Sequence, residues 1–98
     1  MEFFVYILYS ALLDKFYIGF TTSSIEDRIN RHLSDYYDNK FTRKTKDWKL
    51  FYSIKCEKSC QARAIERHIK RMKSKKYIKN LVVYPEISKK LLEKYNDC

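Results

Sequence analysis

A cation and a titratable ring lie one helical turn apart in the first third of the chain, at Arg28 and His32. Residues four apart lie on the same face of a helix, so both side chains would reach one site. Neither Ser24 at i−4 nor Arg31 at i+3 offers Arg28 an acidic partner on its own helix. The position suits an anionic ligand and equally a salt bridge from another element, and His32 alone is a weak indication of catalysis.

Glu66 is the single acidic residue in the basic stretch from residue 63 to 79. It can pair with Lys70 at i+4, a contact worth ~0.3–0.5 kcal/mol in an isolated helix. It also borders the apolar stripe at Ala62 and Ile69, and a carboxylate there, surrounded by cations, could hold a divalent metal together with phosphate oxygens. The position alone leaves both interpretations open.

Tyr6 and Tyr17 fall in two neighbouring apolar segments. If residues 10 to 13 form the intervening loop, with Tyr9 opposite Asp14, the two tyrosines face each other directly across an antiparallel pair. Tyrosine favours strands and cores, which is the simplest explanation. A buried phenol still needs a hydrogen-bond partner, so two hydroxyls on one face imply a polar site beside them.

Gly19, the only glycine, ends the sequence Phe16-Tyr17-Ile18-Gly19, which otherwise favours a strand. Glycine weakens a strand interior, and a missing side chain would let substrate or the following helix approach the sheet closely. A β-bulge explains the glycine equally well. On the first explanation, Gly19→Val is expected to reduce activity more than stability.

Three segments have the pattern of strands. Residues 3 to 9 are apolar throughout, as in a strand covered on both faces. Residues 10 to 14 form a connection, and residues 15 to 20 read as a second strand that pairs back on the first. Apolar residues alternate with mostly polar ones from Trp48 to Cys56, which predicts a third strand.

Helix signals lie between and after these strands. The capping box Ser23-x-x-Glu26 begins a helix over about residues 24 to 35. Ser59 can cap a second helix with an apolar stripe that ends at Met72. A short third helix is predicted over residues 75 to 83, and Pro85 begins a last one that ends near residue 95.

The predicted order is β-β-α-β-α-α-α. It describes a small three-stranded antiparallel sheet covered by helices, in the α+β class. Ninety-eight residues suit one domain, with a core over about residues 3 to 82 and the last helix beyond it.

A net charge of +9 favours an anionic partner such as nucleic acid or an anionic membrane surface. The positive residues gather in two stretches, 40 to 46 and 63 to 79. The residues expected to contact nucleic acid are Lys40, Arg43, Lys44, Lys46, Arg67, Lys70, Arg71, Lys73, Lys75 and Lys76.

No segment approaches the ~20 apolar residues of a membrane span. The N-terminus lacks the basic region and cleavage site of a signal peptide, so a cytoplasmic protein that does not enter the membrane is expected. The Cys56-x3-Cys60 spacing has no second Cys/His pair nearby and Cys98 is the last residue, so the cysteines are interpreted as structural or incidental thiols.

Together these residues resemble the GIY-YIG nuclease family over about residues 3 to 82. The first motif is Phe4-Val5-Tyr6, which keeps only the tyrosine, and the second is Tyr17-Ile18-Gly19, which is intact. Arg28 matches the arginine of the first helix, His32 the His/Tyr position one turn later, and Glu66 the metal-binding glutamate. The resemblance is closest to small, single-domain bacterial members that are similar to the nuclease domain of the excision-repair incision subunit.

The resemblance implies a DNA endonuclease that hydrolyses phosphodiesters with one Mg²⁺ or Mn²⁺ ion on Glu66, in a structure-specific or repair-related role. Arg28 would stabilise the transition-state charge. Tyr6 would orient or deprotonate water, with help from His32, and Tyr17 would position water or phosphate. The basic residues would hold the DNA backbone, and RNA stays a possible substrate.

Two other functions fit the sequence. One is a nucleic-acid-binding module on the same fold without catalysis, and the other is a small interaction protein with a basic face for an acidic partner. The preferred DNA structure and the oligomeric state do not follow from the residues.

Overall fold

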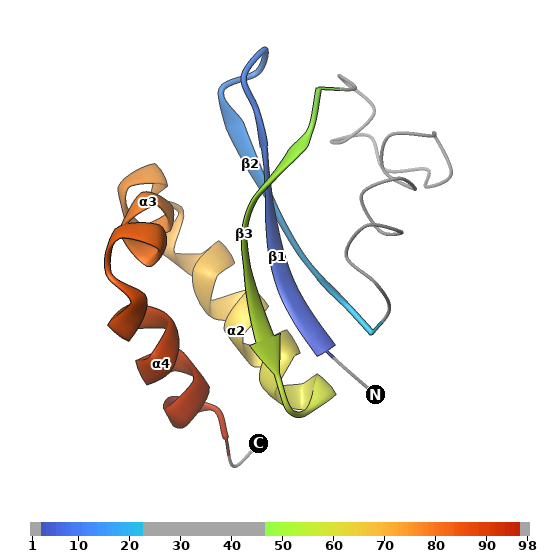
Figure 1. The fold of residues 1–98 in the computed structure, drawn as a ribbon, viewed down its shortest axis with the longest axis vertical. Helices are drawn as coiled ribbons and strands as arrows, with labels where there is room; N and C mark the ends of the chain where they lie inside the picture. Colours follow the sequence, from blue (N-terminus) through green and yellow to red (C-terminus); the bar gives the residue numbers. More distant parts are fainter. Residues whose placement is uncertain (1–2, 23–46, 97–98) are drawn as a thin grey trace.

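A three-stranded antiparallel sheet forms the centre of the fold (Figure 1). The structure is a computed structural model that describes residues 3–22 and 47–96. The strands are β1 (Phe3–Ser10), β2 (Lys15–Thr21) and β3 (Lys49–Cys56), in the spatial order β2-β1-β3. Because β1 is central, its middle residues, from Val5 to Leu8, are fully buried. This explains why residues 3 to 9 are apolar throughout. In a strand with one face toward solvent, apolar and polar residues alternate instead.

Three helices follow the sheet: α2 (Ser59–Met72), α3 (Lys75–Val83) and α4 (Pro85–Lys94). Figure 1 shows all three on the same side of the sheet, with α2 against the strands and α4 further out. The α+β class predicted from the sequence is therefore confirmed. The helix predicted over about residues 24 to 35 lies outside the described residues.

The main core lies between the sheet and α2. Val5 and Ile7 from β1 pack with Ala62, Ile65 and Ile69, which recur along one face of α2 at helical spacing. The apolar stripe of α2 was predicted to end at Met72, and this is wrong at its last position, because Met72 is 44% exposed.

The opposite face of the sheet holds a second cluster, made by Tyr6, Leu8 and Trp48. Trp48 reaches this face because the β1–β3 register shifts between Ile7 and Leu8. The third strand predicted from the alternation between Trp48 and Cys56 is present as β3. The irregularity sends Trp48 to one side of the sheet and Ile54 to the other.

The last helix is tied to the rest of the fold by polar contacts as well as by Leu91. The side chain of Gln61 is 3% exposed, and its Nε2 donates to the carbonyl of Leu92 at 2.8 Å. Tyr52 on β3 shares a 2.7 Å hydrogen bond with Ser88 on α4. Pro85 is the first residue of α4, as predicted.

The caps of α2 and α3 differ. Lys58 is the N-cap of α2 and makes no side-chain cap bond, so the predicted cap at Ser59 is wrong. Ser74 caps α3, and its hydroxyl accepts a hydrogen bond from the backbone N–H of Tyr77 at 3.1 Å. Ser74, unlike Ser59, satisfies a backbone N–H group of the first helical turn that would otherwise be unpaired.

Ser74→Ala is therefore expected to lower the free energy of unfolding by about 1 kcal/mol, the usual cost of losing such a cap. Ser59→Ala is the matched control, since the Ser59 hydroxyl caps nothing and the residue is exposed. Urea denaturation followed by circular dichroism measures both. Equal losses for the two variants would show that the Ser74 hydrogen bond contributes nothing specific.

The two described cysteines differ in their chemical state. Cys56 is a buried free thiol, and burial raises its pKa to about 11. Cys60 is disulfide-bonded, against the expectation of a thiol.

Among the helices in residues 3–22 and 47–96, none has the length and apolar character needed to cross a membrane.

Candidate nuclease site

The register of β1 and β2 places Tyr6 opposite Gly19, not opposite Tyr17. Tyr17 pairs with Leu8, two residue pairs further along the ladder. The predicted pairing is therefore wrong by two residues. A two-residue shift keeps every side chain on its own face of the sheet, so the prediction that Tyr6 and Tyr17 share a face holds.

The hairpin turn explains the shift. β1 continues to Ser10, which pairs with Lys15, and the turn contains only the four residues between them. Asp14 takes a left-handed conformation with φ of 50°, which asparagine and aspartate tolerate better than most residues. The Ser10 hydroxyl donates to Asp47 at 2.6 Å and accepts from the Leu13 N–H at 3.1 Å. These contacts fix the turn and, with it, the register.

Gly19 makes room for the Tyr6 phenol. A Cβ atom built on Gly19 would lie 2.5 Å from Tyr6 Oη and 2.6 Å from Tyr6 Cζ, far inside contact distance. Tyr6 is 1% exposed, so its ring has no open space to enter. The β1–β2 ladder runs without a register shift and Gly19 has no positive φ, so a β-bulge does not explain the glycine. The sequence suggested that substrate or the following helix approaches Gly19, whereas the nearest atoms in the described part of the chain are those of Tyr6.

Three aromatic rings gather on this face of the sheet. The ring of Tyr17 has its centroid 6.4 Å from Tyr6 and 6.5 Å from Trp48. Tyr6 and Trp48 are buried, whereas Tyr17 is only partly covered. Tyr17 is thus the member of the group that solvent or a ligand can reach directly. Trp48 was not expected at the site, because only the bulge in the third strand brings it there.

Glu66 belongs to α2, which packs on the other face of the sheet. Arg63, one turn earlier on α2, lies 5.3 Å over the ring of Phe20, the residue after Gly19. Because Arg63 and Glu66 are three residues apart, they share a flank of α2, and this flank faces β2. Glu66 and the tyrosines therefore border the same outer strand from its two sides.

The Glu66 side chain is 18% exposed, and its Oε1 accepts a hydrogen bond from Lys70 Nζ at 2.9 Å. The i, i+4 ion pair suggested by the sequence is thus present. Within the described residues Glu66 makes no other ion pair or hydrogen bond, which leaves its second oxygen for another ligand.

A metal on Glu66 is chemically consistent with these surroundings. No group of three His, Cys, Asp or Glu side chains that could hold a metal occurs in residues 3–22 and 47–96. Mg²⁺ is commonly held by one or two carboxylates, with water and substrate phosphates completing its shell. One carboxylate with an unused oxygen fits that pattern, and it does not fit a metal enclosed by protein ligands.

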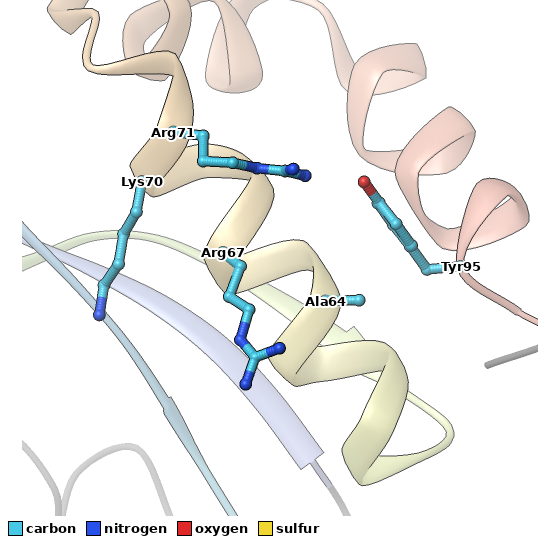
Figure 2. A pocket seen from close by; sticks show the side chains of 5 residues that line it. All are labelled: Ala64, Arg67, Lys70, Arg71 and Tyr95. Carbon is cyan, nitrogen blue, oxygen red and sulfur yellow. The ribbon is translucent and has the colours of Figure 1, made fainter.

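The basic residues of α2 and α3 divide into two groups. Arg67 and Arg71 line a groove of 490 Å³ beside Tyr95, at the end of α4 (Figure 2). Lys73 and Lys75 line a smaller pocket of 220 Å³ toward β2, where Lys75 pairs with Asp14 at 2.9 Å. Lys70 borders both, and Lys76 is exposed.

Sequence reasoning missed two contributors to these surfaces. Lys15 lines the smaller pocket and Tyr95 the larger one. Several predicted site residues lie outside the described part of the chain: Arg28, His32, Lys40, Arg43, Lys44 and Lys46.

Comparison with known proteins agrees with this geometry. The model of the GIY-YIG catalytic domain matches residues 2–79, which include both tyrosines, the glycine and Glu66. Searches of curated proteins and of solved structures give no match. The match covers most of the chain, and the chain belongs to the GIY-YIG family of nuclease domains.

Proposed function

We propose that this protein is a divalent-metal-dependent endonuclease that hydrolyses phosphodiester bonds in DNA. The observation that carries the proposal is the family match over residues 2–79, a range that contains Tyr6, Gly19 and Glu66. The arrangement of Tyr6, Tyr17 and Glu66 around the outer strand β2 supports it.

Glu66 would hold one Mg²⁺ or Mn²⁺ ion through its second carboxylate oxygen. When bound, the metal supplies positive charge to the phosphate and to the leaving oxygen. Lys70 keeps a second positive charge at 2.9 Å from the same carboxylate. This cation suits a site where phosphate oxygens must approach, because it favours anionic ligands near Glu66.

The two tyrosines have different parts in the proposed reaction. The Tyr6 ring is fixed by burial and by its contact with Gly19, so its hydroxyl can orient a water molecule with little loss of entropy. Tyr17 is partly exposed and is proposed to position water or a phosphate oxygen. Proton removal by Tyr6 would require a metal or a cation beside the phenol, because an ordinary phenol is a poor base at neutral pH.

Other roles come from the family alone. Arg28 is proposed to stabilise charge in the transition state and His32 to assist Tyr6. The basic residues of α2 and α3 are proposed to hold the backbone of DNA, with RNA as the alternative nucleic acid. We further propose that residues 1–98 act as a single domain in the cytoplasm, in a role connected with DNA repair.

Cleavage of a panel of DNAs tests the proposal. Plain duplex, flapped, branched and single-stranded DNAs of one sequence are incubated with the protein, with and without Mg²⁺ or Mn²⁺. Nicking is expected only with metal. Binding is expected to weaken steeply between 50 and 200 mM salt, by roughly 10³-fold or more for about six phosphate contacts. Salt-sensitive binding to DNA without cleavage of any substrate would identify a binding module in place of a nuclease.

A further inference from the structure

A groove between α2 and the end of α4 has a chemistry that the proposed cleavage site does not use. Figure 2 shows Ala64 and Arg71 of α2 directed toward Tyr95. Arg67, one turn before Arg71, lies at the edge of the groove. Lys70 points away from Tyr95, toward the sheet, where it pairs with Glu66. The groove thus has an aromatic wall, a small apolar floor and two guanidinium groups.

The arginines have no acidic partner within the described residues, where neither Arg67 nor Arg71 forms an ion pair. They are four residues apart, so both charges lie on neighbouring turns of α2. Lys94 adds a third cation 5.4 Å from the centroid of the Tyr95 ring. This concentration of positive charge calls for an anion, and guanidinium groups are well suited to phosphate.

The Tyr95 ring is held in place by its neighbours. Its hydroxyl is 2.9 Å from His68 Nδ1, and the two rings are nearly perpendicular, with centroids 5.8 Å apart. Tyr95 also packs against the main core. A ring fixed in this way, opposite a planar guanidinium, offers two surfaces between which a flat group can stack.

We propose that this groove binds an unpaired nucleotide of the nucleic-acid substrate, with its base against Tyr95 and Arg71 and its phosphate at Arg67. A duplex presents phosphates but keeps its base faces stacked inside, so it would leave the aromatic wall unused. A single-stranded tail uses both the cations and the ring. This inference rests on the proposed function and specifies it: the substrate carries a single-stranded tail beside the cleavage position.

The position of the groove favours this assignment. Glu66 and Arg67 are consecutive on α2, so the groove begins about 100° around the helix from the proposed metal ligand. A strand that leaves Glu66 can reach the groove by passing over Lys70 and Arg67.

Fluorescence anisotropy in EDTA tests the inference without cleavage. The probes are a labelled blunt hairpin duplex and the same duplex with a tail of five dT residues. Wild type is expected to bind the tailed probe at least about fivefold more tightly, the range found for one stacked base. Arg71→Ala and Tyr95→Ala should abolish the difference, whereas Tyr95→Phe, which keeps the ring, should retain it.

Lys90→Ala is the matched control, since it also removes one exposed positive charge but lies on α4 away from the groove. It should weaken the binding of both probes equally. Arg71 is exposed, so its replacement should leave the fold intact even if Tyr95→Ala does not.

Three results would overturn the inference. Equal binding of both probes by wild type, with cleavage of duplex intact, would refute the groove and leave the proposed nuclease function standing. Failure of wild type to bind or cut either probe would refute both. Poly-glutamate and an oligo-dT of equal charge are also compared as competitors of the tailed probe. Equal displacement of the probe by the two would assign the groove to an acidic protein partner.

Discussion

Glu66→Gln is expected to reduce metal-dependent cleavage by at least about a hundredfold while the protein remains folded. The amide keeps the shape of the side chain but loses the negative charge that would hold the metal. Metal ions in such sites contribute several kcal/mol to transition-state stability, and each 1.4 kcal/mol corresponds to a tenfold change in rate. Single-turnover cleavage of a flapped DNA in Mg²⁺ measures the effect.

The stability of the variant should hardly change. Glu66 makes one ion pair, with a Lys70 side chain that is 50% exposed, and such pairs contribute about 0.5 kcal/mol or less. Glu93→Gln is the control, because it removes the same charge from an exposed position on α4. Cleavage by Glu66→Gln at the rate of the wild type would remove Glu66 from the catalytic site.

Gly19→Ala is expected to destabilise the protein by about 1–3 kcal/mol and to abolish most of its activity. The new methyl group would overlap the Tyr6 ring, and overpacking of a filled interior has this cost. The burial of Tyr6 means that the ring cannot swing away freely. This result differs from the expectation raised by the sequence for Gly19→Val, in which the loss of activity was the larger effect.

A double-mutant cycle separates this contact from a general backbone effect. In a Tyr6→Ala background the added methyl meets no ring, so the stability cost of Gly19→Ala should largely disappear. Tyr6→Phe should give little relief, because Cζ as well as Oη lies within 3 Å of the built Cβ position. Thermal or urea unfolding gives the coupling energy. An equal cost of Gly19→Ala in all three backgrounds would show that Tyr6 is not the reason for the glycine.

Local signals in the sequence predicted much of the fold. The third helix was expected over residues 75 to 83 and occupies Lys75–Val83, because Ser74 caps one end and Pro85 starts a new helix just after the other. The central strand was recognised because only a strand covered on both faces is apolar throughout. Periodicity and caps act within a few residues, which is why they can be read directly.

Properties that depend on distant residues were missed. The hairpin register depends on a left-handed Asp14 and on a contact from Ser10 to Asp47, far along the chain. The irregular pairing of β1 and β3, which moves Trp48 to the tyrosine face, has no local signature.

For the candidate site as well, local features were predicted from the sequence and features that depend on distant residues were not. Tyr6 and Tyr17 were placed on one face correctly, since a period of two survives a register error of two residues. The sequence also identified Glu66 and its pair with Lys70. The groove at Tyr95 was not predicted, because the packing of α2 against the end of α4 brings its walls together and no spacing within one helix reports that packing.

The attachment of α4 has a consequence for how this protein can be shortened or recombined. The family match ends at residue 79, yet Gln61, inside the matched segment, gives its amide to Leu92, and Tyr52 bonds to Ser88. A chain cut at the family boundary would leave the buried Gln61 amide without its acceptor and would uncover the core at Leu91. The segment that identifies the family is therefore smaller than the unit that folds. Any transplant of this nuclease domain into another protein should carry the chain through residue 96.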